Sequence, residues 1–321
     1  MVMGFPARVL GCSGPAVSAI GLGCMGMSEF YGHTDRNASL RTIAAALEAG
    51  VNLFDTGDFY GMGTNELLLS EALRGKRDNA FIQVKFGAMR GPDGAFIGMD
   101  ARPAAARNSL SYSLKRLATD HVDLYMTGLD TAVPIEDTVG ALGELVRQGY
   151  VRYVGLTNTD ADTIRRAHAV HPITAVQFEY GLMSRDMEDS VLPVCRELGI
   201  GITAYGVLGR GLLTGSKGSG DGDFRSTLYA RFQGDNLTNN QRLVEALAKV
   251  ARSEGITAAQ AAISWVLSQG KDIIPLIGAR TEQRLAEALA SPMHLSEDSL
   301  AAIEAAVPAD AVQGDRFMVR H

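Results

Sequence analysis

Short apolar runs rich in β-branched residues alternate along the chain with segments of helical periodicity. The runs predict eight strands, at residues 19–24, 51–54, 80–84, 122–126, 151–156, 175–178, 201–205 and 273–277. Helices are predicted between them, at residues 39–49, 104–117, 135–147, 160–169, 187–197, 241–253 and 258–267. Alternating strands and helices indicate parallel strands, and eight such units favour an α/β fold, a closed (β/α)8 TIM barrel. A doubly wound open sheet is the alternative, but the number of strands disfavours it.

Two regions stand outside this alternation. Residues 7–10 and 16–17 flank Gly11-Cys12-Ser13-Gly14-Pro15, a pattern that predicts an N-terminal β-hairpin capping the bottom of the barrel. Residues 211–236 hold four closely spaced glycines and predict either a functional lid or a disordered surface loop. Because no repeat, charge block or linker divides the chain, we expect a single domain over residues 1–321.

Composition narrows the classes of function. The 321 residues are 46% hydrophobic and 21% charged, which excludes a disordered chain, and the net charge of −6 argues against a nucleic-acid partner. No apolar run reaches the roughly 18 residues that span a bilayer, and no signal peptide is visible at the start. Three cysteines show neither a disulfide framework nor metal-ligand spacing. We expect a cytoplasmic protein with a small-molecule substrate, no membrane or metal, and an open oligomeric state that includes a homo-oligomer.

Polar residues end several predicted strands, which is where TIM barrels carry their chemistry. Asp55 ends one apolar run, Lys85 ends the next, and Tyr60 lies five residues after Asp55. If the three meet, Lys85 is expected to lower the pKa of the phenol and Asp55 to keep Lys85 charged. Such a phenol is a usable general acid. A structural ion pair is an equally common reason for a strand-end Asp or Lys.

Several motifs resemble those of the aldo-keto reductase family. They are Phe54-Asp55-Thr56-Gly57-Asp58-Phe59-Tyr60-Gly61 with Asn65-Glu66, Gly21-Leu22-Gly23-Cys24-Met25-Gly26-Met27, Val84-Lys85-Phe86-Gly87, Ser113-Leu114-Lys115-Arg116-Leu117, Asp123-Leu124-Tyr125, Val154-Gly155-Leu156-Thr157-Asn158, Ala175-Val176-Gln177 and Leu208-Gly209-Arg210-Gly211. The resemblance covers roughly residues 10–290 in the family's order and spacing. It looks closest to the short-loop bacterial and fungal branch.

The resemblance implies roles for individual residues. It makes Asp55, Tyr60 and Lys85 three members of the catalytic tetrad, with Tyr60 as proton donor. It assigns an NADPH site to these positions: Gly23, Met25, Asp55, Thr157, Asn158, Gln177, Tyr205, Gly206, Val207, Leu208, Gly209, Arg210, Gly211, Lys217, Gly278, Arg280, Arg284 and Glu287. Thr157, Asn158 and Gln177 would hold the nicotinamide carboxamide, and Tyr205 would stack on its ring. Residues 206–211 would offer backbone N–H groups to the pyrophosphate.

Two arginines point to NADPH rather than NADH. Arg280 and Arg284 stand four residues apart at a predicted helix start, where both can hold a 2′-phosphate. Lys217 and Arg231 are further candidates for phosphate contacts, and solvated surface charges are the alternative reading of both.

The tetrad histidine of the family is missing. Counting from Asp123 puts Gly128 at its position, whereas counting back from Asp130 puts Thr127 there. His33, in the loop after the first strand, is the one histidine expected on the same side. Because neither Thr127 nor Gly128 can replace an imidazole, we expect a larger substrate that supplies its own activation, such as a conjugated enone.

Three functions therefore compete. The first is an NADPH-dependent oxidoreductase that reduces a carbonyl or conjugated enone of a larger, specialised-metabolite substrate, with Tyr60 as proton donor. The second is an NADPH-binding regulatory subunit with little turnover, as potassium-channel β subunits are within this family. The third is a non-redox cyclase or isomerase on the same scaffold. The retained Asp55, Tyr60 and Lys85 favour the first.

Overall fold

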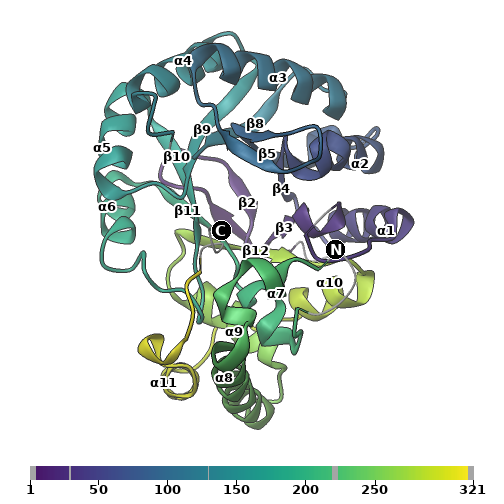
Figure 1. Cartoon of the computed structure of the whole chain (residues 1–321), viewed down its shortest axis with the longest axis vertical. Helices are drawn as coiled ribbons and strands as arrows, with labels where there is room; N and C mark the ends of the chain where they lie inside the picture. Colours follow the sequence, from purple (N-terminus) through teal and green to yellow (C-terminus); the bar gives the residue numbers. More distant parts are fainter. Residues whose placement is uncertain (1–4, 29, 129, 219–222, 317–321) are drawn as a thin grey trace.

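The protein is described by a computed structural model that covers residues 5–28, 30–128, 130–218 and 223–316. Parallel strands close into a barrel in the order β10-β11-β12-β3-β4-β5-β8-β9, with helices around it (Figure 1). The barrel strands are β3 (Gly21–Gly23), β4 (Leu53–Gly57), β5 (Phe81–Phe86), β8 (Val122–Thr127), β9 (Val151–Thr157), β10 (Ile173–Glu179), β11 (Gly201–Tyr205) and β12 (Ile273–Gly278). The predicted TIM barrel is confirmed, and each predicted strand overlaps an observed one.

The helices are α1 (Arg36–Glu48), α2 (Thr64–Ala72), α3 (Pro103–Leu117), α4 (Ile135–Arg147), α5 (Ala161–Val170), α6 (Val191–Leu198), α7 (Arg225–Leu228), α8 (Gly234–Ser253), α9 (Ala258–Ser268), α10 (Glu282–Leu289) and α11 (Glu297–Ala306). The bounds of α4 are those predicted. Helix α2 was not predicted, because it is short and follows the catalytic motif directly. Helix α8 begins seven residues before its predicted start, so the irregular region after residue 211 is shorter than expected.

Two antiparallel hairpins flank the barrel. Strands β1 (Ala7–Val9) and β2 (Ala16–Ser18) pair as predicted, and Leu10 and Val17 from this hairpin are fully buried in the inner core. They therefore close the bottom of the barrel. A second hairpin, β6 (Ala88–Arg90) and β7 (Phe96–Met99), follows β5 and was not predicted.

Side chains alternate between two cores, as the pleat of a strand requires. The inner core fills the lower barrel with Leu53, Phe81, Leu124, Met126, Ala175, Ile274 and Leu276, while residues between these positions pack against the helices. Above the inner apolar layer, inward positions become polar: Asp55, Gln83, Lys85 and Gln177 are all buried. Buried polar side chains need hydrogen-bond partners, and these four gather towards the C-terminal ends of the strands, where TIM barrels carry their active sites. This layer is therefore the candidate site.

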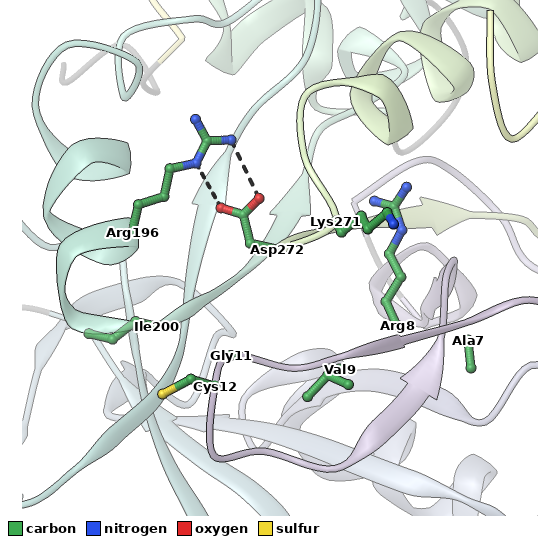
Figure 2. A pocket seen from close by; sticks show the side chains of 10 residues that line it. Ala7, Arg8, Val9, Gly11, Cys12, Arg196, Ile200, Lys271 and Asp272 are labelled. Carbon is green, nitrogen blue, oxygen red and sulfur yellow. Dashed lines mark hydrogen bonds and ion pairs between the residues drawn. The ribbon is translucent and has the colours of Figure 1, made fainter.

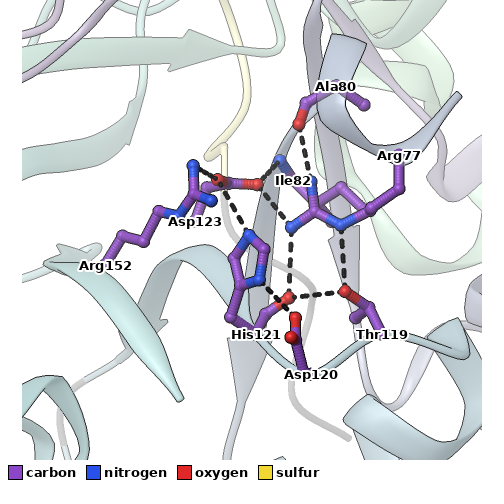
Figure 3. Close-up of polar contacts among 8 residues, drawn as sticks. All are labelled: Arg77, Ala80, Ile82, Thr119, Asp120, His121, Asp123 and Arg152. Atoms are coloured by element: carbon purple, nitrogen blue, oxygen red, sulfur yellow. Dashed lines mark hydrogen bonds and ion pairs between the residues drawn. The ribbon is translucent and has the colours of Figure 1, made fainter. Parts of the chain in front are cut away.

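A charged cluster at the start of β8 belongs to the opposite end of the barrel (Figure 3). Asp123 Oδ2 accepts hydrogen bonds from Arg77 Nη2 at 2.7 Å and from the backbone N–H of Ile82 at 2.8 Å. Its other oxygen lies 3.3 Å from Arg152 Nη1 and 3.8 Å from His121 Nε2. His121 therefore lies at the bottom of the barrel. In the residues described, no helix is long and apolar enough to cross a membrane.

Candidate active site

Three donors converge on a single carboxylate oxygen in the C-terminal half of the barrel. Asp55 Oδ1 accepts from Lys85 Nζ at 2.5 Å, from Gln83 Nε2 at 2.7 Å and from Gln177 Nε2 at 2.7 Å. Asp55 and Lys85 are each 5% exposed, so the ion pair is shielded from water. Burial lowers the pKa of Lys85, and the charge of Asp55 opposes this effect. The expected meeting of Asp55 and Lys85 is thus seen, with Gln83 as an unpredicted member.

Tyr60 lies over this pair on the short turn that follows β4. Lys85 Nζ is 5.0 Å from the centroid of the Tyr60 ring, and the ring meets Phe59 edge-on at 4.8 Å between centroids. The pKa of Tyr60 is raised well above its usual value, first by burial and then by the charge of Asp55. The expectation that Lys85 lowers this pKa is wrong, because desolvation of the phenolate dominates. Tyr60 is consequently a protonated phenol at neutral pH.

Strand alternation decides between the two candidates for the missing histidine position. Leu124 and Met126 face the inner core, so position 128 is the next inward position of this strand. Thr127 is fully buried on the other face, and its Oγ1 donates to Gly128 O at 3.2 Å. A Cβ added to Gly128 would lie 3.5 Å from Met99 Cε and 3.5 Å from Thr157 O, which are ordinary contacts. The inward position is therefore a glycine with space beside it, and Met99 is its neighbour.

The residues expected around the nicotinamide occupy the ends of β9, β10 and β11. Thr157 ends β9 and is largely buried, while Asn158 is exposed with a left-handed φ of 49°. Asn158 Oδ1 accepts a hydrogen bond from Tyr205 Oη at 3.0 Å, and its backbone N–H donates to Gln177 O. Burial raises the pKa of Tyr205 to about 12. Gln177 donates one amide N–H to Asp55, and its amide oxygen and second N–H are left for the expected contact with the carboxamide.

The turn after β11 has the backbone that the pyrophosphate assignment requires. Gly206, Gly209, Arg210 and Gly211 have left-handed φ values of 70°, 57°, 53° and 96°. Successive residues of this kind turn N–H groups towards one side. A Cβ on Gly206 would lie 2.9 Å from Glu179 Cγ, so a glycine is needed here on both grounds. Two of the N–H groups, those of Gly209 and Gly211, already donate to carbonyls within the turn.

The Arg210 side chain does not reach solvent as a free cation. Its guanidinium pairs with the buried Glu179 at 2.7 Å and lies 4.4 Å from the ring centroid of Tyr229. Arg231, expected as a phosphate contact, donates instead to Ser184 Oγ and Gly314 O and lies 3.5 Å from Glu179. Its guanidinium is thus engaged by protein groups. Lys217 is exposed, next to residues outside the described part of the chain.

The two arginines expected at the 2′-phosphate both lie at the start of α10. Thr281 caps this helix by accepting the N–H of Arg284, and both arginines are exposed. Arg280 Nη1 donates to Tyr31 O at 2.8 Å and Arg284 Nη1 pairs with Glu287 at 2.9 Å. A helix N-terminus with two guanidinium groups suits a dianion. Gly278 is the exposed end of β12, next to Gly23, the end of β3.

Residues 223–225, in the irregular region after β11, contact the loop that follows β3. Tyr31 and Asp223 form an isolated antiparallel bridge, and Arg225 lies 5.0 Å from the Tyr31 ring centroid while pairing with Asp223 at 2.5 Å. Met25 is half-buried at the base of the same loop. In the region predicted as a lid or a disordered loop, residues 223–232 contain helix α7 and contact the loop after β3, and residues 219–222 lie outside the described residues.

His33 lies in this loop but is exposed, and its described contact is through its backbone carbonyl, which accepts from Arg280. Nothing in the described contacts brings its imidazole to Tyr60. The described residues also contain no group of three or more His, Cys, Asp or Glu side chains arranged to hold a metal ion.

A cavity of about 610 Å³ lies at the hairpin end of the barrel, not at the end that carries Asp55, Lys85 and Tyr60 (Figure 2). Arg8 donates to the carbonyls of Leu267, Gly270 and Ile273, and Arg196 pairs with Asp272 at 2.9 Å. These cations hold the ends of α9 and β12 together, so we read the cavity as structural.

Sequence reasoning missed Gln83 and Met99. Gln83 carried a signal, since it stands two positions before Lys85 on a predicted strand and so shares its inward face. Met99 carried none, because the hairpin that brings it beside Gly128 was not predicted.

Comparison with known proteins was made against this geometry. The sequence model of the aldo/keto reductase family matches residues 19–308. The chain is 42% identical to probable aldo-keto reductase 1 of Glycine max over 316 residues, which cover 96% of this chain and 90% of that protein. It superposes on a glycerol dehydrogenase from Gluconobacter oxydans with a TM-score of 0.83 and 27% identity, covering 94% of this chain and 96% of the other. An aldo/keto reductase from Klebsiella pneumoniae in complex with NADP and acetate gives a TM-score of 0.75 and 25% identity over 94% and 95% of the chains.

Proposed function

Because this chain belongs to the aldo/keto reductase family, we propose that it is an NADPH-dependent oxidoreductase that reduces a carbonyl or a conjugated enone. The observation that carries the proposal is the buried cluster of Asp55, Lys85 and Tyr60. A regulatory subunit without turnover would not need a shielded ion pair beneath a protonated phenol, and burying the two charges costs free energy.

The rim of the barrel fits NADPH chemically. The left-handed turn at residues 206–211 suits a pyrophosphate, and the α10 N-terminus with Arg280 and Arg284 suits a 2′-phosphate. Tyr205, at the end of β11, offers an aromatic face for the nicotinamide ring. The bound form of the Klebsiella protein contains NADP, which supports the same cofactor here. When bound, NADPH supplies the hydride.

The residues of the chain then donate the proton and stabilise the negative charge that develops in the reaction. Tyr60 holds the proton, because its raised pKa keeps the phenol neutral until negative charge develops on the substrate oxygen. Lys85, close to the Tyr60 ring, stabilises the phenolate that remains after transfer. Asp55 holds Lys85 in place, and the amides of Gln83 and Gln177 fix the Asp55 carboxylate. Tyr60 is thus the acid of the site, and Lys85 is a cation held in position beside it.

Gly128 bears on the class of substrate. With no side chain there, the site lacks a second donor for the substrate oxygen but gains space beside Met99. A small unactivated aldehyde loses more from the missing donor than a substrate whose carbonyl is conjugated. We therefore propose a larger enone or quinone-like substrate that fills the space.

Turnover assays test this function. NADPH consumption is followed with 4-nitrobenzaldehyde and with a panel of cyclic enones and larger ketones, for the parent and for Tyr60→Phe. Loss of the proton donor should lower kcat by about 10²-fold or more and leave NADPH affinity nearly unchanged. The exposed Tyr112 provides the matched control, Tyr112→Phe. Tight NADPH binding without consumption across the panel would instead favour a regulatory subunit, and product formation without NADPH loss would favour a cyclase or isomerase.

A further inference from the structure

The turn that carries Tyr60 has an unusual backbone. Gly61, Met62 and Gly63 follow one another with left-handed φ values of 53°, 52° and 93°. For Met62, which has a side chain, this conformation is unfavourable, and such residues persist only where their surroundings hold them. A side chain that holds the backbone of residues 61–63 in this conformation therefore also bears on the position of the neighbouring Tyr60 side chain.

Arg116 of α3 is packed against this turn. A Cβ on Gly63 would lie 2.8 Å from both Cδ and Nε of Arg116, so the arginine lies directly on the Gly63 backbone. Its Nε donates to Glu66 Oε2, and Glu66 is fully buried in the first turn of α2. A single guanidinium thus ties α3 to the turn and to the helix that follows it.

A second carboxyl group, that of Asp58, is buried on the same turn. Asp58 precedes Tyr60 by two residues, and its Oδ1 is buried without a hydrogen-bond partner among the described residues, as is Glu66 Oε1. Burial raises the pKa of Asp58 to about 7, the charge of Glu66 adds to this effect, and Ser109 and Arg116 oppose it. Lys85 on β5 and Tyr125 on β8 also face Asp58.

We propose that Asp58, Glu66 and Arg116 form a positioning clamp, which holds the left-handed turn and so sets where the Tyr60 hydroxyl lies. The proposal rests on the proposed function only in giving Tyr60 the role of proton donor. It gives Glu66 and Arg116 a role beside the Tyr60 turn, although no described contact joins either residue to Asp55 or Lys85. Asn65 makes a parallel anchor, since it accepts from Thr56 Oγ1 at 2.7 Å and donates to Cys24 O at 2.8 Å.

The clamp contains two carboxyl groups and one guanidinium, so its state changes with pH. Below about pH 7 Asp58 is neutral and Arg116 serves Glu66 alone. As the pH rises through about 7, Asp58 ionises, and its charge then acts on both Glu66 and Arg116. The hold on Gly63 weakens, and kcat falls over the same range.

Four variants test the clamp. Arg116→Lys keeps the charge but loses the planar fork, Glu66→Gln removes the partner charge, and Asp58→Asn removes the second ionisation. The control is Glu71→Gln on the same helix α2, because Glu71 pairs with Arg36 on the surface at 2.6 Å. Hydrogen exchange over residues 57–64 is measured beside kcat and NADPH affinity at pH 6.5 and 8.5.

In Arg116→Lys and Glu66→Gln, exchange over residues 57–64 should accelerate at least about tenfold at pH 6.5, and kcat should fall about tenfold with NADPH affinity within about twofold. In Asp58→Asn, the ratio of kcat at pH 6.5 to kcat at pH 8.5 should approach 1, and exchange at pH 8.5 should be slower than in the parent. Glu71→Gln should match the parent throughout.

Parent-like exchange of residues 57–64 in Arg116→Lys and Glu66→Gln, or equal acceleration over the whole chain, would overturn the clamp. If both variants fail to fold, exchange in Asp58→Asn at pH 8.5 decides the question, and equality with the parent counts against it. A parent without turnover on any carbonyl would sink the proposed function alone, because the exchange readout needs no substrate.

Discussion

Asp55→Asn should destabilise the fold as well as the site, because it leaves Lys85 without a counter-charge in the barrel. Both side chains are 5% exposed, and the pair is joined at 2.5 Å. Removing one partner of such a buried pair costs about 3–5 kcal/mol. Alternatively, Lys85 can lose its proton in the folded variant. With an ordinary pKa of 10.5, deprotonating it at pH 7 costs about 4.8 kcal/mol, at ~1.4 kcal/mol per pH unit. Both routes predict a loss of roughly 3–5 kcal/mol.

The second route gives the prediction a pH dependence of known sign. In the variant, folded Lys85 is neutral while the unfolded lysine binds a proton, so the stability of the variant rises with pH. In the parent the charge of Asp55 opposes the loss of the Lys85 proton, so the stability of the parent depends less steeply on pH. The difference in the free energy of unfolding between parent and variant should therefore decrease by about 1.4 kcal/mol per pH unit from pH 7 to pH 9.

Urea unfolding of both proteins at pH 7, 8 and 9, followed by circular dichroism, measures this gap. Asp272→Asn is the control, because the Asp272–Arg196 pair is partly exposed at the other end of the barrel and should cost no more than about 1 kcal/mol. A gap below about 1 kcal/mol at pH 7, or one that stays constant up to pH 9, would refute the picture of a shielded pair.

Further predictions concern the cofactor, the substrate and the fold. Arg280→Ala and Arg284→Ala should each weaken NADPH binding about 10- to 150-fold and NADH binding little; equal effects on both cofactors would remove them from the 2′-phosphate. Gly128→His should raise kcat/KM for 4-nitrobenzaldehyde relative to cyclic enones, and an unchanged ratio would contradict our account of this position. Gly206→Ala should lower stability by about 1–3 kcal/mol, measured by thermal unfolding, because its φ is 70° and its Cβ would meet Glu179 at 2.9 Å; parent-like stability would show that the turn relaxes.

Periodicity determined most of the fold from the sequence alone. The barrel strands, the N-terminal hairpin and helices such as α4 follow from local alternation of apolar and polar residues, which depends only on neighbours in the chain. The strand-end placement of Asp55 and Lys85 follows from the same pattern, since parallel strands in a barrel present their ends on one face. Helix α2 and the β6–β7 hairpin did not follow, because both are short and their faces are set by contacts with distant segments.

The environment of each site residue was decided only by the tertiary structure. The sequence placed Lys85 near Tyr60 and suggested a lowered pKa for the phenol, but burial from all sides of the barrel raises it instead. Neither count along the chain could choose between Thr127 and Gly128, whereas the inward facing of Leu124 and Met126 did so at once. Desolvation and side-chain direction depend on what lies across the barrel, and Arg116 shows the same dependence, because its contact with Gly63 joins residues 53 positions apart.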